Sequence, residues 1–98
     1  MKSYKELTVY QKAYELSLRV YKITEKFPAE EKFGLISQMR RAAVSIPCNI
    51  AEGYRRRSRK EYIQFLHIAL GSCSELETLI SLSKDLKIIA DRNYYDLQ

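Results

Sequence analysis

The fold is decided by the stretch SQMRRAAVSIPCNIAEGY, which covers residues 37–54. Its apolar residues, together with the one just before it, recur every three or four positions, which is typical of one face of an α-helix. They are Ile36, Met39, Ala43, Ile46 and Ile50. Pro47 stands inside this pattern and cannot donate a backbone hydrogen bond to the carbonyl of Ala43. Because the pattern continues beyond it, we expect one helix over residues 31–53 with a kink at Pro47.

Two more long helices are predicted on either side of this stretch. Residues 8–27 carry apolar side chains at a spacing of four and three residues, after a capping box in which Thr8 is the N-cap. Residues 59–87 show helical periodicity after a second capping box that begins at Ser58. Residues 92–98 predict a fourth helix of only about 10 Å, at about 1.5 Å per residue.

Composition supports a single helical domain over residues 1–98, which makes the protein all-α. Of the 98 residues, 46% are hydrophobic and 30% are charged, which is ordinary for a globular protein and too apolar for a disordered one. Three glycines and two prolines leave few turns, which disfavours a sandwich or barrel of many strands. No apolar run is long enough to span a membrane, and the first residues lack the apolar core of a signal peptide. We therefore expect a cytoplasmic protein without a membrane partner.

Positive charge is concentrated in one short segment. The chain has 17 Lys and Arg against 12 Asp and Glu, for a net charge of +5. Residues 40–60 hold seven cations and one anion, or +6, so the other 77 residues hold ten cations and eleven anions, or −1. Clustered arginines bind phosphate groups through forked hydrogen bonds. The segment predicts a nucleic-acid-binding site formed by Arg55, Arg56, Arg57, Arg59 and Lys60, with Arg40 and Arg41 joining if they face the same rim.

A polar row on the second predicted helix indicates a structural seam. Its members are Gln38, Arg41, Ser45, Asn49 and Glu52, which are three or four residues apart. An unpaired polar group in a buried helix costs about 1–3 kcal/mol, so these side chains need partners. A hydrogen-bonded seam that fixes the register between helices or subunits is the favoured interpretation, and a ligand site is the alternative.

The sequence contains no motif that has the residue types and spacing of a catalytic or metal-binding site. His67 is the only histidine and has no serine, aspartate or metal-type partner close in sequence. The three glycines lie far apart and form no phosphate-binding loop. Cys48 and Cys73 match neither a metal motif nor a disulfide framework, so both are expected to be reduced and packed in the core. We therefore predict no enzyme activity, no catalytic residues, no metal and no cofactor.

The central stretch also resembles a known family. Its core, Ser45-Ile46-Pro47-Cys48-Asn49-Ile50-Ala51-Glu52-Gly53, is followed by Ser58, Glu61, Phe65 and the run Ala69-Leu70-Gly71-Ser72. This pattern is similar to that of bacterial four-helix-bundle proteins encoded in intervening sequences of 23S rRNA genes. The resemblance covers nearly the whole chain, from Tyr4 to near Ile89. It implies an antiparallel up-down four-helix bundle, here with a short or truncated fourth helix, that assembles into a homo-oligomeric ring of five copies.

The resemblance also implies partners. Related accessory proteins of diversity-generating retroelements use a basic ring surface to bind nucleic acid and a reverse transcriptase. Self-assembly is predicted independently by the second helix, where Val44, Cys48 and Ala51 form a second apolar face. The leading hypothesis is a non-enzymatic oligomeric module that binds RNA through its basic stretch. The alternative is a protein–protein scaffold or accessory subunit without a nucleic-acid role, in which the arginines form a solvated connection.

Overall fold

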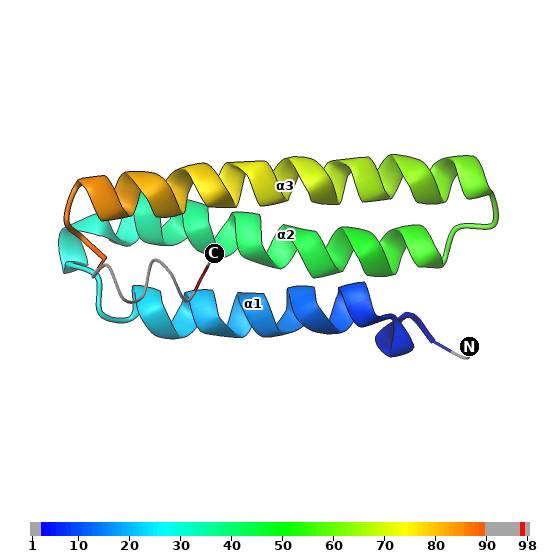
Figure 1. The fold of residues 1–98 in the computed structure, drawn as a ribbon, viewed down its shortest axis with the longest axis horizontal. Coiled ribbons are helices and arrows are strands. Elements are labelled where there is room, and N and C mark those ends of the chain that lie inside the picture. The colour runs from blue at the N-terminus through cyan, green and yellow to red at the C-terminus, as the bar shows by residue number, and fades with distance from the viewer. Residues whose placement is uncertain (1–2, 90–96, 98) are drawn as a thin grey trace.

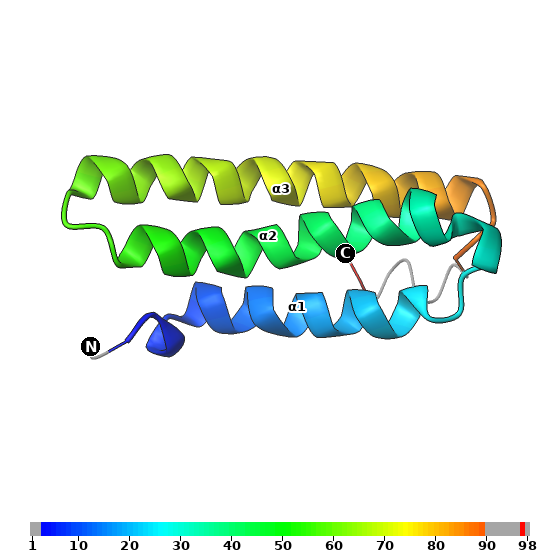
Figure 2. The same cartoon turned by 180° about the vertical axis from the view of Figure 1, so that it is seen from behind.

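The computed structural model describes residues 3–89 and 97, and that part of the chain contains helices and no strands. Three long helices make up the fold: α1 (Thr8–Thr24), α2 (Ser37–Tyr54) and α3 (Arg59–Asp85). They run side by side in alternating directions, with α2 between α1 and α3 (Figure 1). The same order is seen from behind, so α2 is the central helix (Figure 2). The predicted all-α class is confirmed.

The connection between α1 and α2 differs from the expected helix ends. α1 ends at Thr24 rather than at residue 27, and α2 begins at Ser37 rather than at residue 31. A 3₁₀ turn, η2 (Ala29–Glu31), and a wide π turn, η3 (Lys32–Ile36), fill the connection. Gly34 inside η3 has φ −106° and ψ −108°, outside the helical region, so regular hydrogen bonding starts only after it.

The start of α1 also differs from the predicted capping box. Thr8 is already helical, and its hydroxyl makes no capping hydrogen bond, because Leu7 is the N-cap. The chain before it forms a 3₁₀ turn, η1 (Tyr4–Glu6), capped by Ser3. Gln11 reaches back past the helix end and donates from Nε2 to the carbonyl of Lys5 at 3.0 Å. A side chain therefore anchors η1 to α1, but not in the way that the sequence predicted.

The fourth helix predicted over residues 92–98 lies outside the described residues, apart from Leu97. Leu97 is buried, and it lines a small cavity of about 150 Å³ with Leu16 of α1 and Leu76 and Ile80 of α3. Three helices are therefore seen, and the predicted count of four is not confirmed.

The core lies where the apolar stripe of α2 meets both neighbouring helices. The buried apolar side chains of α2 are Met39, Ala42, Ala43, Ile46, Pro47 and Ile50. The buried apolar side chains of the neighbours are Ala13 and Val20 of α1 and Ala69, Leu76, Leu79 and Ile80 of α3. The periodicity of residues 37–54 thus identifies the most buried part of the fold.

Pro47 leaves α2 continuous, and a side chain of α1 compensates for the hydrogen bond that proline cannot make. The hydroxyl of Ser17 lies 3.0 Å from the carbonyl oxygen of Ala43, the acceptor that Pro47 leaves without its usual helical donor. Ser17 is buried and also lies 3.1 Å from the carbonyl of Ala13. The defect in α2 is therefore satisfied across the α1–α2 interface, which ties the two helices at one level.

Gly53 lies inside α2, and α3 passes it closely. A Cβ added at Gly53 would lie 2.7 Å from the Cβ of Phe65 and 3.1 Å from Cδ1 of Tyr62. Carbon atoms that are not bonded prefer a separation of about 3.5–4.0 Å, so a side chain at this position would push the helices apart. The sequence predicts that the helix ends at Gly53, and α2 ends one residue later, at Tyr54. The structure adds that Gly53 allows a close helix–helix contact.

Replacing Gly53 by alanine should destabilise the fold. Overpacking costs about 1–3 kcal/mol, which outweighs the roughly 1 kcal/mol that alanine gains over glycine inside a helix. Gly71→Ala is the matched control, since Gly71 also lies inside a helix and nothing lies within 4 Å of its Cβ position. Urea denaturation at one protein concentration should show a loss of stability for Gly53→Ala and a gain for Gly71→Ala. A gain for both would contradict the close contact.

Replacing Ser17 by alanine should cost about 1–3 kcal/mol of unfolding free energy, because the buried carbonyl of Ala43 loses its donor. In a Pro47→Ala background the backbone N–H of residue 47 supplies that hydrogen bond, so the same substitution should cost less. A double-mutant cycle of Ser17→Ala and Pro47→Ala, measured by urea denaturation, isolates this coupling. An equal cost of Ser17→Ala in both backgrounds would show that the hydroxyl does not compensate for the proline.

Candidate nucleic-acid interface

Residues 55–60, which we call the basic loop, join the end of α2 to the start of α3 and are all exposed. Ser58 is the N-cap of α3 and accepts a hydrogen bond from the N–H of Glu61 at 3.0 Å, as the capping box predicts. This cap places Arg59 and Lys60 in the first turn of α3. Their charges add to the positive end of the helix dipole, which favours an anion at this site.

Two cations of the basic loop are held against the protein surface. The guanidinium of Arg55 lies 5.2 Å from the ring centre of Tyr4. Nη2 of Arg56 lies 2.6 Å from Oε1 of Glu52, and its guanidinium lies 4.9 Å from the ring centre of Phe65. Within the part of the chain that the structure describes, Arg57, Arg59 and Lys60 make no ion pair and no side-chain hydrogen bond. These three side chains are therefore available for phosphate groups.

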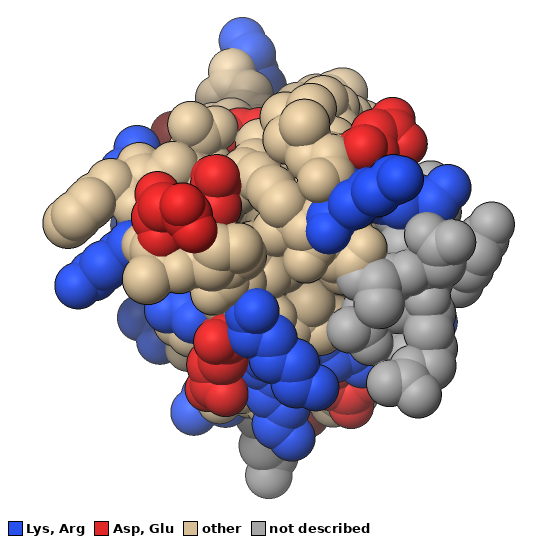
Figure 3. Space-filling view, turned by 90° about the vertical axis from the view of Figure 1, so that its left-hand side faces the viewer, with Lys and Arg blue, Asp and Glu red and all other residues tan. Residues whose placement is uncertain are grey.

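The two ends of the bundle differ in charge. Around the basic loop, residues 52–61 hold five cations and two anions, for a net charge of +3. At the opposite end, residues 24–41 and 84–89 hold six cations, including Arg40 and Arg41, and four anions, for a net charge of +2 over 24 residues. Basic (Lys or Arg) and acidic side chains are interspersed over the surface of that end (Figure 3). Positive charge is thus densest at the end that carries the basic loop.

Arg40 and Arg41 lie in the first turns of α2, far from the basic loop. Fifteen residues separate Arg40 from Arg55, which is about 22 Å of helix at 1.5 Å per residue. Nε of Arg40 donates to Oγ1 of Thr24 at 2.9 Å, and its guanidinium lies 4.5 Å from the ring centre of Tyr21. Arg40 therefore ties α2 to the end of α1, while Arg41 is exposed. Within one copy, neither side chain is brought to the basic loop.

The polar row of α2 divides into an inner pair and an outer set. The hydroxyls of Ser45 and Ser72 lie 2.8 Å apart and join α2 to α3. Nδ2 of Asn49 donates to the carbonyl of Ser45 at 2.7 Å and lies 3.0 Å from its hydroxyl. The outer members Gln38, Arg41 and Glu52 are exposed. Ser45 thus forms the hydrogen bond between helices and Asn49 supports it from within α2, whereas the outer members face away from the core.

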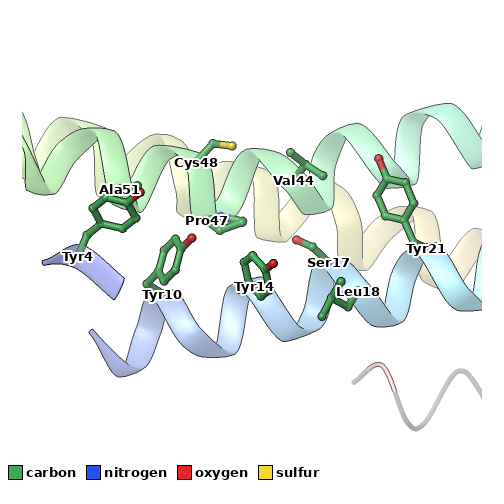
Figure 4. A pocket seen from close by; sticks show the side chains of 10 residues that line it. All are labelled: Tyr4, Tyr10, Tyr14, Ser17, Leu18, Tyr21, Val44, Pro47, Cys48 and Ala51. Carbon is green, nitrogen blue, oxygen red and sulfur yellow. The ribbon is translucent and has the colours of Figure 1, made fainter. Parts of the chain in front are cut away.

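A groove between α1 and α2, which we call the tyrosine groove, was missed by the sequence reasoning. It has a volume of about 480 Å³, and side chains of both helices face one another across it (Figure 4). It is lined by Tyr4, Tyr10, Tyr14, Ser17, Leu18, Tyr21, Val44, Pro47, Cys48 and Ala51. The signal in the sequence is the stripe Tyr10, Tyr14, Leu18 and Tyr21, which recurs at helical spacing beside the buried stripe of α1.

The rings inside the tyrosine groove pack on one another. The ring centres of Tyr4 and Tyr10 lie 5.0 Å apart edge to face, and those of Tyr10 and Tyr14 lie 6.0 Å apart. Burial raises the pKa of the Tyr10 hydroxyl, and the neighbouring Tyr4 and Tyr14 add to the shift. The groove therefore presents neutral aromatic surface, and none of its lining residues carries a full charge.

The sequence predicts that both cysteines are packed in the core, and the structure shows otherwise. Cys48 is exposed at the tyrosine groove, and Cys73 is half-buried on α3. Burial raises the pKa of the Cys73 thiol, with a further contribution from Glu77, so its reactive thiolate is disfavoured. The expectation was wrong for Cys48 because its face of α2 points away from the core.

A metal-binding cluster is not found among residues 3–89 and 97. No group of three or more His, Cys, Asp or Glu side chains in this part of the chain is placed to hold a metal ion. His67 is exposed on α3, away from the tyrosine groove. No helix in the described residues is both long enough and apolar enough to cross a membrane.

Comparison with known proteins confirms the family that the sequence resembles. No curated protein matches the chain. A sequence model of one family, described as 23S rRNA-intervening sequence protein, matches residues 5–98. Because this match covers nearly all of the 98 residues, the chain belongs to the 23S rRNA-intervening sequence protein family.

Proposed function

We propose that this protein is a non-enzymatic helical module that assembles with copies of itself and binds RNA through the basic loop. The observation that carries the proposal is the set of exposed, unpaired cations Arg57, Arg59 and Lys60 at one end of the bundle. This end has a net charge of +3 over ten residues, whereas the opposite end has a net charge of +2 over 24 residues. RNA is the favoured polyanion because the family is described by its relation to 23S rRNA genes.

The chemistry of the basic loop favours the phosphate backbone over the bases. Arginine and lysine neutralise phosphates and release counterions, which makes binding strongly dependent on salt. The cations lie on an exposed turn and on the first turn of a helix, and none of them lines the tyrosine groove. Binding should therefore show little sequence preference.

Self-assembly is supported by apolar side chains that a lone copy leaves in water. Leu18 is 54% exposed, Ile68 is 52% exposed and Leu70 is 62% exposed. Apolar patches of this kind mark protein–protein contacts more often than free surface on a monomer. A ring of five copies, as the sequence resemblance implies, would cover such faces and multiply the charge of the basic loops.

A protein–protein scaffold is the second candidate, and the tyrosine groove favours it. Tyrosine is enriched at protein interfaces, where the ring is buried and the hydroxyl stays hydrated. In this reading the partner is another protein, such as a reverse transcriptase, and the basic loop serves solubility or docking. The two candidates differ in whether removal of the loop charges abolishes RNA binding.

Removing the three unpaired charges by Arg57→Ser, Arg59→Gln and Lys60→Gln should weaken RNA binding. About 0.7 of a unit of log–log salt slope is lost per phosphate contact on a single strand, so the slope should become shallower by about 2. The affinity of labelled single-stranded RNA, measured by fluorescence anisotropy at physiological salt, should fall more than tenfold.

The matched control is the triple variant Lys22→Gln, Lys26→Gln and Lys32→Gln, which has the same net charge and alters exposed lysines near the opposite end. It should bind RNA nearly as tightly as the parent. Equal binding by the two triple variants would contradict a site at the basic loop, and the scaffold reading would then hold. Circular dichroism and light scattering check that helicity and mass are unchanged.

A further inference from the structure

We infer that the tyrosine groove of one copy receives the outer face of α3 of the next copy, with Arg41 of the first paired to Glu75 of the second. This inference rests on the self-assembly in the proposed function and names the two surfaces that meet. The surfaces differ from each other, so the contact is heterologous and repeats from copy to copy.

The outer face of α3 is a stripe that the fold leaves without a partner. It consists of Ile68, Glu75, Leu82 and Leu86, which are spaced seven, seven and four residues apart and so lie on one side of the helix. Ile68, Leu82 and Leu86 are 52%, 45% and 57% exposed. By the level of the Ser45–Ser72 bond, Leu82 and Leu86 lie about 15 and 21 Å from Ser72, past the level of Arg41. The part of the stripe at the height of the tyrosine groove is Ile68 with Glu75, which needs an apolar surface next to a cation.

The tyrosine groove offers that kind of surface. Its lining is aromatic and aliphatic and carries no cation, so a chain of phosphates would find no charge partner inside it. The groove adjoins a second hollow of about 550 Å³, which shares Tyr21 and Val44 with it and is lined by both Arg40 and Arg41. Arg40 already donates to Thr24, so Arg41 is the cation left for a partner. A neighbouring protein surface with one acidic side chain is therefore a better occupant than a nucleic acid.

Arg41 and Glu75 stand at the same height along the bundle. The hydrogen bond between Ser45 and Ser72 fixes the level of α2 against α3. Arg41 lies four residues from Ser45 and Glu75 three residues from Ser72, and both lie toward the same end because the helices are antiparallel. At 1.5 Å per residue these offsets are about 6 and about 4.5 Å, so the levels differ by only about 1.5 Å.

Neither charge has an ion pair within its own copy, as far as residues 3–89 and 97 show, and both side chains are exposed. Rotation about an axis parallel to the helices keeps every residue at its own level. Such a rotation brings Arg41 of one copy to the height of Glu75 of the next. It also brings Ile68 to the height of Cys48, since these residues lie four and three positions from the Ser72–Ser45 bond toward the other end.

This arrangement has a consequence for the basic loop. Because all copies keep the same direction along the axis, every basic loop emerges at the same rim of the assembly. The net charge of +3 at that end of one copy is then repeated around the rim. A polyanion that spans neighbouring copies meets more cations than one copy can offer.

Charge reversal tests the pairing. Arg41→Glu and Glu75→Arg should each weaken self-association at least tenfold, measured by light scattering over a range of concentrations. The double variant Arg41→Glu with Glu75→Arg restores the opposite charges and should regain most of the parent's association. Arg19→Glu is the control, because it changes the net charge as Arg41→Glu does at an exposed position that lines neither hollow.

Cross-linking tests the register independently. In an Ile68→Cys variant, a short bifunctional thiol reagent should link residue 68 of one copy to Cys48 of the next and give a ladder of linked chains. The ladder should disappear when Cys48→Ser is added. Ile63→Cys places a thiol at another exposed site of α3, since Ile63 is 43% exposed, and it should give no ladder.

Each outcome separates this inference from the proposed function. Three outcomes overturn the inference and leave RNA binding by the basic loop intact. They are an assembled mass that neither charge reversal changes, a double variant that does not regain association, and an equal ladder from Ile63→Cys. Loss of RNA affinity in Arg41→Glu with unchanged mass would show that the groove holds nucleic acid instead. A parent mass of 11.5 kDa, that of one chain, would overturn both this contact and the self-assembly.

Discussion

Two close contacts fix α2 against its neighbours: the hydrogen bond of the Ser17 hydroxyl joins it to α1, and the missing side chain of Gly53 lets α3 approach. The first satisfies the carbonyl that Pro47 leaves open, 3.0 Å away, and the second lets α3 approach until a Cβ would lie 2.7 Å from Phe65. Each contact fixes a level as well as a distance, because a hydrogen bond or a steric notch works at only one position along a helix. The central helix therefore sets the register of the whole bundle.

That register determines where the functional surfaces lie. The turn after Gly53 carries the basic loop to one end, and Arg40 and Arg41 remain at the other end of α2. Between them, the groove along α1 and α2 exposes tyrosines on a face that the core does not use. Charge and apolar surface are thus separated: the loop offers cations, which the proposed RNA binding requires, and the groove offers neutral surface, which the proposed contact between copies requires.

Much of the fold could be predicted from the sequence, because helical periodicity decides which residues share a face. The stripe from Met39 to Ile50 is buried as expected, and the capping box at Ser58 starts α3. The helix ends near residues 24 and 37 could not be placed this way, because Gly34 and the turns around it follow local backbone geometry that periodicity does not record. Thr8 likewise matches a capping pattern, but the preceding 3₁₀ turn moves the N-cap to Leu7.

The candidate site was only partly predictable. The charge count located the basic loop, since net charge needs no geometry. It could not show that Arg40 binds Thr24, or that Arg56 pairs with Glu52, because those contacts depend on which helices become neighbours. The tyrosine groove was missed for the same reason. The second stripe of α1 forms a groove only together with α2, and the sequence does not show which face of α2 lies beside it.

The salt dependence of RNA binding tests most directly whether assembly sums the basic loops. One loop carries five cations, which limits the log–log slope for a single strand to about −3.5 at about 0.7 per phosphate. With a long single-stranded RNA, the assembled parent should give a steeper slope than this limit, and Arg41→Glu should fall within it. The double variant with Glu75→Arg should return to the parent slope, while Arg19→Glu leaves it unchanged. A parent slope within the limit of a single loop, or equal slopes for the parent and Arg41→Glu, would contradict the account.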